Sequence, residues 1–228
     1  MEKLFKLTPH VLAAINSKVD ASTATGMGVI GAFEAFQKCF SQDFTDGVLV
    51  HGCGSVGRIV ASELVKRKIK TFVVDVDTKK TNIPGVISLG NDKNWYRKNF
   101  DVIFPCSISG LISTNIAQFL LKTKAIISAA NGPFSNDVIP TKLTDSNVVI
   151  IPDPLVNAGA VIADSIEKYA PDAWTRTSAE KVYNFVQEEV RKKCFTYLSL
   201  EQSGLESKEI LSLMQNDRQE IIGKSFLN

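Results

Sequence analysis

The chain has 228 residues, of which 44% are hydrophobic and 22% are charged, and its formal net charge is +2. This profile is typical of a globular protein with one sizeable core, and its charge is too small to indicate a nucleic-acid partner. The sequence contains no apolar run near the roughly 20 residues of a membrane span, and the amino terminus, MEKLFKLTPH, lacks a signal-peptide core. We therefore expect a cytoplasmic protein without a membrane partner.

The first predicted element is a helix over residues 23–40, TATGMGVIGAFEAFQKCF. This segment is apolar and rich in small side chains, and Ser22 or Thr23 is its expected N-cap. Its glycines lower helix propensity, but they allow another backbone or a ligand to approach closely.

Five short apolar runs follow, and helical patterns separate them. The runs cover residues 48–51, 71–76, 102–105, 125–130 and 148–151, and the intervening helices are expected at 56–68, 113–121 and near 136–143. Almost continuously apolar runs are typical of strands that are buried on both faces of a parallel sheet. Their alternation with helices predicts an α/β fold, a doubly wound parallel (Rossmann) sheet with flanking amino-terminal and carboxyl-terminal helices.

Helical spacing returns at residues 158–170 and 178–200, and the polar tail that follows is expected to end in one more helix. We expect one NAD(P)-binding domain over residues 1–228, with its core at 22–170 and a helical extension at 171–228. The four cysteines lie far apart without a C-x-x-C pair. This pattern favours reduced thiols and indicates neither a disulfide framework nor a metal site.

A glycine motif joins the first strand to the next helix. Gly52, Gly54 and Gly57 form G-x-G-x-x-G, and Asp75 ends the second predicted strand. In a dinucleotide site the first glycine permits the turn, the second lets a pyrophosphate approach, and the third allows the helix to pack on the strand. The carboxylate then accepts hydrogen bonds from a ribose, and with Asp77 it repels a 2′-phosphate, so NAD is favoured over NADP. The alternative is a structural turn without a ligand.

Four further motifs accompany the glycine motif, HGCGSVG at 51–57, in a recognisable order. They are STATGMGVIGAF at 22–33, FPCSISG at 104–110, ISAANGPF at 127–134 and PDPLVNAGAVI at 152–162. With these motifs the chain resembles the cofactor-binding half of the glutamate/leucine/phenylalanine/valine dehydrogenases, particularly the leucine and phenylalanine members. The resemblance covers roughly residues 20 to 200 and implies oxidative deamination of an amino acid with NAD, or the reverse reaction through an imine.

The glycine motif and the resemblance together imply a set of cofactor-binding residues. Asn131 is implied beside the nicotinamide ribose, and Thr25 and Asn157 near the nicotinamide. The complete expected set is Thr25, Gly52, Gly54, Ser55, Val56, Gly57, Asp75, Val76, Cys106, Ser107, Ala130, Asn131 and Asn157. No metal ligand is expected.

The family's catalytic residues have no counterpart in this sequence. In that family a separate amino-terminal domain carries two glycine-flanked lysines, and here about 20 residues without such a lysine stand in its place. Carbinolamine chemistry needs a lysine of lowered pKa to activate water. His51 and Asp153 are therefore the remaining candidates. The structural alternatives are a hydrogen-bonded histidine at a strand end and a capping aspartate.

Two functions fit these observations. The first is an NAD(P)-dependent oxidoreductase in a truncated form, which transfers hydride between nicotinamide and an amino acid, an imine or a related carbonyl compound. A preformed imine suits such an enzyme because its reduction requires no activated water. The second is a non-catalytic NAD-binding subunit or sensor that a partner chain completes. Either function is expected to involve a homo-oligomer or a partner chain that covers the open cleft.

Overall fold

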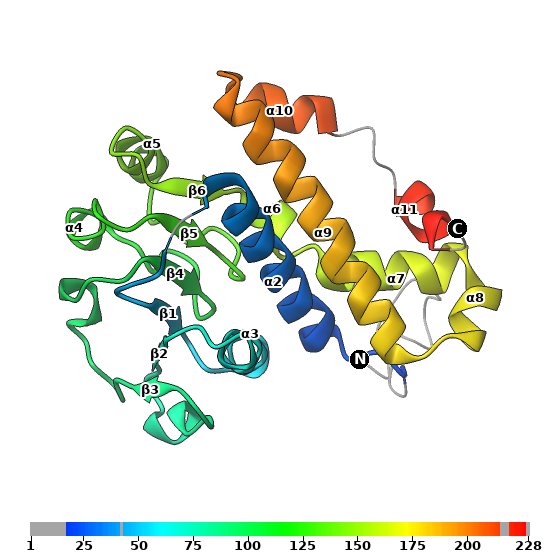
Figure 1. The fold of residues 1–228 in the computed structure, drawn as a ribbon, viewed down its shortest axis with the longest axis horizontal. Coiled ribbons are helices and arrows are strands. Elements are labelled where there is room, and N and C mark those ends of the chain that lie inside the picture. The colour runs from blue at the N-terminus through cyan, green and yellow to red at the C-terminus, as the bar shows by residue number, and fades with distance from the viewer. Residues whose placement is uncertain (1–16, 42, 215–218, 227–228) are drawn as a thin grey trace.

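The computed structural model describes residues 17–41, 43–214 and 219–226. At its centre lies a parallel sheet of six strands in the order β3-β2-β1-β4-β5-β6 (Figure 1). The strands are β1 (Val48–His51), β2 (Thr71–Val74), β3 (Ile87–Ser88), β4 (Val102–Pro105), β5 (Ala125–Ile127) and β6 (Val149–Ile151). The strand order reverses between β1 and β4, and ligands of such sheets bind outside the carboxyl ends of the strands at this point. The predicted doubly wound parallel sheet is confirmed.

Alternation along the strands produces two cores, one on each face of the sheet. Val48 and Val50 of β1 pack with α2 (Ala21–Phe40) and α3 (Ser55–Lys66) on one face. Leu49 between them packs on the other face with α4 (Thr114–Ala117), α5 (Val138–Thr144) and the short helix η2 (Trp95–Arg97). A further short helix, η1 (Thr78–Thr81), follows β2. Both faces of the sheet are therefore covered, which explains the continuously apolar strand sequences.

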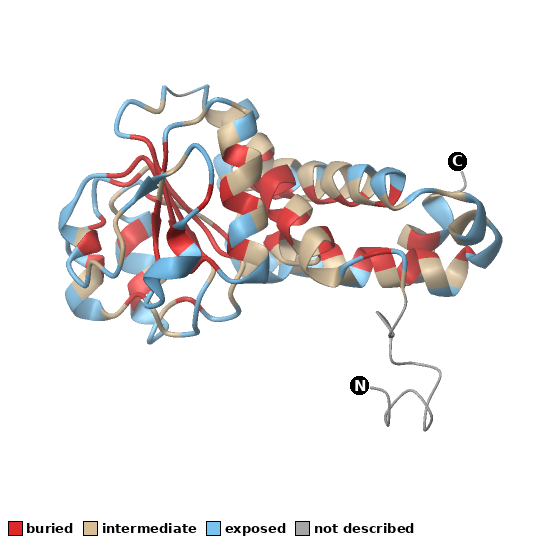
Figure 2. Ribbon diagram, turned by 90° about the horizontal axis from the view of Figure 1, so that it is seen from below, coloured by how far each residue is buried: buried red, intermediate tan, exposed pale blue. Residues whose placement is uncertain are grey.

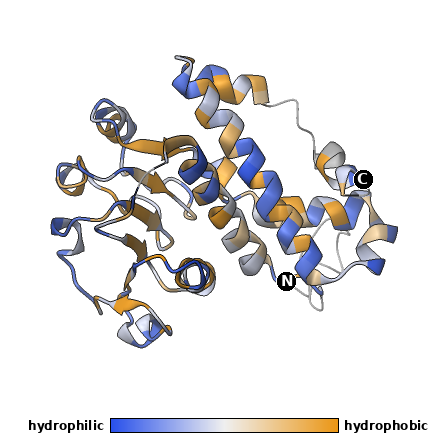
Figure 3. Cartoon of the chain, in the orientation of Figure 1, coloured by the Kyte–Doolittle hydropathy of each residue, from blue (hydrophilic) through white to orange (hydrophobic). Residues whose placement is uncertain are grey.

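A second group of helices lies beside the sheet (Figure 1). Here α2 packs along the long helix α9, and Figure 2 shows that buried residues line the region between them. In Figure 3 the strands are mainly hydrophobic, whereas much of the visible surface of α9 is hydrophilic. Besides α2, this group consists of α6 (Asp153–Val156), α7 (Gly159–Tyr169), α8 (Pro171–Arg176), α9 (Ala179–Gln202), α10 (Ser207–Met214) and α11 (Gln219–Ser225).

Glycines permit the close packing of these helices. A Cβ atom on Gly31 of α2 would lie 2.2 Å from the carbonyl oxygen of Gln187 in α9. A Cβ atom on Gly159 of α7 would lie 2.0 Å from the carbonyl oxygen of Ala24 in α2. Neither position accepts a larger residue without movement of a backbone, so Gly31 fixes how closely α2 packs on α9 and Gly159 fixes how closely α7 packs on α2.

The structure corrects several predicted boundaries. Asp20, and not Ser22 or Thr23, is the N-cap of α2, because its Oδ1 accepts the Thr23 N–H at 2.7 Å. Strands β2 and β5 end at Val74 and Ile127, before the ends of their apolar runs. The described part of the tail holds two helices, α10 and α11, where one was predicted.

Two features are absent from the described residues. None of the helices there has the length and apolar character needed to cross a membrane. Within the same residues no group of three or more histidine, cysteine, aspartate or glutamate side chains is arranged to hold a metal ion.

Candidate functional site

The glycine turn connects β1 to α3 at the switch point of the sheet. Gly52 has φ +94°, and its N–H donates to the Val74 carbonyl oxygen at 2.8 Å. A Cβ atom on Gly52 would lie 2.6 Å from the Cβ of Ser107, in the loop after β4. Glycine is therefore required here both by the backbone conformation and by the neighbouring loop.

The next two glycines of the turn have opposite surroundings. A Cβ atom on Gly54 would meet nothing within 4 Å, whereas one on Gly57 would lie 1.9 Å from the carbonyl oxygen of Gly52. Gly54 is also the N-cap residue of α3, and no side chain caps this helix. The turn thus presents the first N–H groups of a helix beside open space, which is the arrangement that binds a phosphate group.

Asp75 follows β2 and braces the glycine turn. Its Oδ2 accepts the Cys53 N–H at 2.6 Å, and its Oδ1 accepts the Asp77 N–H at 2.8 Å. The residue is 8% exposed. Each carboxylate oxygen keeps a second lone pair, so the group can still accept a hydrogen bond from a ligand hydroxyl. Next to it the Val76 side chain is 82% exposed and offers an apolar surface at the same edge of the sheet.

The loop after β4 contacts the carboxyl end of β1. The Ser107 hydroxyl lies 2.9 Å from His51 Nδ1, and the His51 ring packs edge-on against Trp95 at 5.0 Å between centroids. Burial lowers the pKa of His51 below its ordinary value, which favours the neutral imidazole. Burial also raises the pKa of the Cys106 thiol to about 12, so this group is not a thiolate nucleophile near neutral pH.

The other end of the carboxyl edge brings together four of the predicted residues. Asn157 Nδ2 donates to Asn131 Oδ1 at 2.7 Å, and Asp153 Oδ2 accepts the Gly132 N–H at 3.2 Å. Thr25 lies at the start of α2 beside α7, where a Cβ atom on Gly159 would approach its Cα to 2.9 Å.

The remaining hydrogen bonds at this end set the orientation of individual groups. The Thr25 hydroxyl donates to the Ala21 carbonyl oxygen at 2.9 Å. Its oxygen lone pairs remain able to accept from a ligand amide. Ala130, between β5 and Asn131, is fixed by its N–H, which donates to the Pro105 carbonyl oxygen at 3.1 Å.

Two charged residues before α2 have structural partners. The Lys18 ammonium donates to the carbonyl oxygens of Trp174 and Thr177, the latter at 2.8 Å. Asp20 caps α2. With these partners, neither side chain is positioned as a general acid or base at the carboxyl edge of the sheet.

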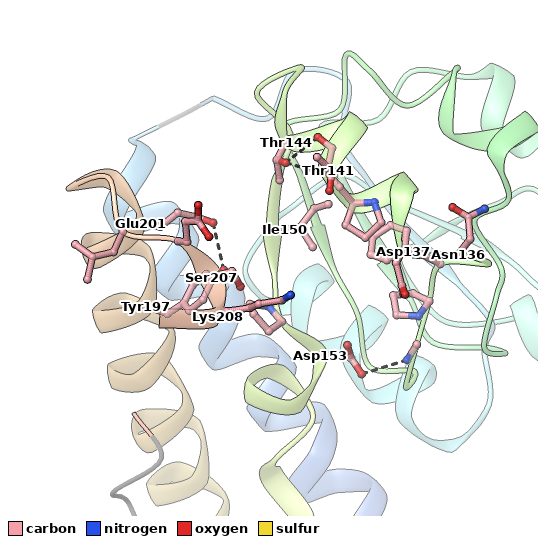
Figure 4. A pocket seen from close by; sticks show the side chains of 17 residues that line it. Asn136, Asp137, Thr141, Thr144, Ile150, Asp153, Tyr197, Glu201, Ser207 and Lys208 are labelled. Carbon is pink, nitrogen blue, oxygen red and sulfur yellow. Dashed lines mark hydrogen bonds between the residues drawn. The ribbon is translucent and has the colours of Figure 1, made fainter. Parts of the chain in front are cut away.

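Sequence reasoning missed a cavity of about 700 Å³ at the outer edge of β6 (Figure 4). It lies between α5 and the corner where α9 meets α10, and it shares Gly132 and Asp153 with the group described above. Its walls come from two parts of the chain, residues 132–153 and 197–208, which are 44 residues apart at their nearest ends. No local pattern in the sequence signals such an assembly.

Comparisons with known proteins agree with this geometry. Residues 64–216 match the family model of the glutamate/leucine/phenylalanine/valine dehydrogenases. A phenylalanine dehydrogenase of Caldalkalibacillus thermarum is 32% identical over 164 residues, which are 67% of this chain and 44% of the relative. An L-tryptophan dehydrogenase of Nostoc punctiforme is 27% identical over 162 residues, 68% of this chain and 46% of that protein.

Solved structures show the same fold. The crystal structure of L-tryptophan dehydrogenase from Nostoc punctiforme superposes with a TM-score of 0.71 at 21% identity, over 89% of this chain and 61% of that one. The chain spans less than half the length of the two curated relatives named above.

Proposed function

The chain belongs to the glutamate/leucine/phenylalanine/valine dehydrogenase family, and from this premise we propose that it binds a nicotinamide dinucleotide across the carboxyl edge of its sheet and acts as an oxidoreductase on an amino acid or an imine. The observation that carries the proposal is the contrast within the glycine turn. Gly54 faces open space at the uncapped start of α3, whereas Gly57 is closed by the Gly52 carbonyl oxygen. A purely structural turn needs the close packing at Gly57 but not the open space at Gly54.

The proposed cofactor runs from β2 toward β6. Asp75 would accept a ribose hydroxyl, and the exposed Val76 side chain would contact the adenosine. The first N–H groups of α3, from Ser55 and Val56, would bind the diphosphate. The carboxylates of Asp75 and Asp77 repel a 2′-phosphate, and on this basis we propose NAD over NADP.

The nicotinamide end would lie against Asn131, Asn157 and Thr25. A hydrogen bond joins Asn131 to Asn157, and the Thr25 hydroxyl is bonded to the Ala21 carbonyl oxygen. These bonds would fix the three side chains before any ligand binds, so they are suited to orient a carboxamide and its ribose. The nicotinamide supplies the hydride. The chain itself would hold the nicotinamide ring in position and would supply one carboxylate, that of Asp153, which lies beside Gly132. Cys106 and Ser107 would contact the cofactor between its two ends.

The substrate side of the cleft requires further residues. We propose that a second copy or a partner chain covers this side of the cleft, because the exposed Val76 side chain and the open space beside Gly54 leave the carboxyl edge uncovered within the described part of the single chain. A non-catalytic nucleotide-binding subunit is the second candidate function. The bonding of Lys18 to two backbone carbonyls favours it, since this lysine is not placed to activate water.

A turnover assay separates the two candidates. The full chain is incubated with NADH and a panel of imines, and separately with 2-keto acids plus ammonia, while the loss of NADH absorbance is followed. Saturable oxidation of NADH supports the enzyme. Saturable NADH binding without turnover supports the non-catalytic subunit, and the absence of NADH binding contradicts both.

A further inference from the structure

Another cavity lies among the helices beside the sheet, apart from the carboxyl edge. It opens between α8, α9 and the end of α11, and its volume is about 660 Å³. In Figure 1 these helices meet, at the start of α9, on the side of the molecule away from the strands. Small-molecule sites extend over roughly 300–1,000 Å³, so the cavity has the size of a ligand site. Its lining residues are Ala173, Arg176, Thr177, Lys181, Phe185, Glu189, Lys192, Ser225 and Phe226.

The apolar part of this lining is aromatic. The ring of Phe185 on α9 and the ring of Phe226, which follows α11, pack edge to face with 5.1 Å between their centroids. Ala173 of α8 adds a methyl group to the same lining. Both rings are only partly buried, so a ligand that covered them would remove apolar surface from water. A flat aromatic ring is the shape that packs best on such a pair.

The charged part of the lining has an excess of cations. Lys192 Nζ lies 3.0 Å from Glu189 Oε1, and this pair is neutral as a whole. Arg176 and Lys181 are exposed, and neither forms a salt bridge within the part of the chain that the structure describes. The Arg176 guanidinium donates from Nε to the Asp172 carbonyl oxygen at 3.2 Å, and its two terminal nitrogens can still donate to a ligand. The lining therefore favours a ligand with two negative charges.

The two cations come from one short segment at the junction of α8 and α9. Arg176 is the last residue of α8, and Lys181 lies in the first turn of α9. Between them the Ser178 hydroxyl is occupied, because it accepts the Lys181 N–H at 3.3 Å. The Thr177 hydroxyl has no hydrogen-bond partner among the described residues and can donate to a ligand. Two cations and a hydroxyl donor so close in sequence suit one compact anionic group.

A phosphate monoester is an anionic group of this kind. At neutral pH it carries about 1.5 to 2 negative charges and three strong acceptor oxygens. Arginine and lysine side chains both bind it, the former through two parallel hydrogen bonds. A carboxylate carries a single charge and would leave one of the two cations unpaired. The aromatic and the cationic parts of the lining together point to a phosphate that is attached to a ring.

We propose that this cavity binds a small aromatic phosphate monoester, at a site separate from the dinucleotide cleft. Arg176 and Lys181 would bind the phosphate oxygens, and Thr177 would donate a hydrogen bond to one of them. The ring of the ligand would pack on Phe185 and Phe226. None of the residues that line this cavity belongs to the proposed set of cofactor contacts or to the lining of the cavity at the β6 edge.

The test is calorimetry of the full chain at pH 7.5 with phenyl phosphate and three partial ligands. Phenyl phosphate should bind saturably. Inorganic phosphate lacks the ring, benzyl alcohol lacks the charge, and benzoate has only one charge, so each should bind about tenfold or more weakly. If inorganic phosphate binds as tightly as phenyl phosphate, the aromatic lining contributes nothing and the proposal is wrong.

Substitutions at exposed positions locate the binding without disturbing the core. Lys181→Met and Arg176→Met should each weaken the binding of phenyl phosphate about tenfold. Lys142→Met, on α5 and outside the lining, is the matched control and should not change it. Ser225→Trp should fill the cavity and abolish binding. All four side chains are exposed, so the melting temperature of each variant without ligand should equal that of the native chain.

Two further measurements separate this site from the glycine turn, where a phosphate group is also expected to bind. Saturating NADH and the substitution Gly54→Ala should both leave the affinity for phenyl phosphate unchanged, and Lys181→Met should leave the affinity for NADH unchanged. The proposal is overturned if phenyl phosphate gives no saturable heat up to about 10 mM, if Lys181→Met binds it as the native chain does, or if NADH displaces it.

Discussion

Gly54 and Gly57 stand three residues apart in one turn, yet a methyl group would have different consequences at the two positions. At Gly54 the space beside the backbone is open, and φ is −69°, a value that alanine adopts freely. At Gly57 the same methyl group would overlap the Gly52 carbonyl oxygen. Substitution to alanine can therefore separate a requirement for ligand binding from a requirement for folding.

Gly54→Ala should keep the melting temperature of the free protein and remove most of the increase in that temperature which NADH causes. The reason is that the added methyl group occupies the approach path of the diphosphate without touching the protein. Gly57→Ala should lower the melting temperature of the free protein itself, by the several degrees that correspond to about 1–3 kcal/mol. Thermal unfolding with and without NADH measures both. If NADH raises the melting temperature of Gly54→Ala as much as that of the native chain, the proposed diphosphate site at the glycine turn is contradicted.

Asp164 on α7 gives a prediction about pH. Burial, and then the neighbouring Glu167 charge, raises its pKa from 3.8 to about 6. The folded state therefore binds this proton more tightly than the unfolded state, and the resulting stability is present below pH 3.8 and is lost as pH rises through about 6.

Asp164→Asn should consequently be more stable than the native chain above pH 6, by about 1 kcal/mol after allowance for solvent screening of this half-exposed group. The two proteins should converge at low pH, where both side chains are neutral. Urea unfolding at pH 4 and pH 7.5 measures the difference. If the native chain and Asp164→Asn have equal free energies of unfolding at pH 4 and also at pH 7.5, burial does not perturb the pKa of Asp164.

At the scale of elements, the packing of α2 on α9 depends on a backbone contact that only glycine permits. Gly31→Ala should lower the free energy of unfolding by about 1–3 kcal/mol, because the added methyl group would approach the Gln187 carbonyl oxygen to 2.2 Å. The gain in helix propensity, about 1 kcal/mol, offsets part of this cost. Urea denaturation measures the change. Ser22→Ala, in the same helix, is the control and should not destabilise the protein.

The elements that the sequence predicted are those with a strong hydrophobic period. The apolar runs located β1, β2, β4, β5 and β6, and the helical patterns located α2, α3, α7 and α9 and, with looser bounds, α4 and α5. The two-residue strand β3 and the short helices α6 and α8 were not predicted, because segments of two to six residues carry too little periodicity. The N-cap of α2 was placed two or three residues late, since several side chains before the helix have suitable oxygens.

Among the site residues, those that act within one turn were predicted from the sequence, whereas contacts between separate segments were not. The G-x-G-x-x-G spacing identified Gly52, Gly54 and Gly57 because each performs its role within one turn. That Asp75 would accept the N–H groups of Cys53 and Asp77 was not predicted, since these bonds depend on how the turn folds over the end of β2. The contact between Asn131 and Asn157 joins residues 26 positions apart and was not predicted; the family resemblance implied only that both residues lie near the nicotinamide end of a cofactor.

At the scale of the whole molecule, the fold places the proposed contacts with the dinucleotide along the carboxyl edge of the sheet. Strand order 3-2-1-4-5-6 sets the glycine turn at the switch point, with Asp75 on one side and Asn131 and Asn157 on the other. The family resemblance, which the sequence motifs predicted, is confirmed. The cavity at the β6 edge could not be predicted, because its walls come from distant parts of the chain.

The most direct test of the central claim is a calorimetric titration of the full chain with NADH and NADPH. The account predicts one saturable site per chain for NADH, with a dissociation constant below about 1 mM, and weaker binding of NADPH. If neither nucleotide gives saturable heat at millimolar concentrations, the glycine turn is a structural connection and the proposed function is wrong.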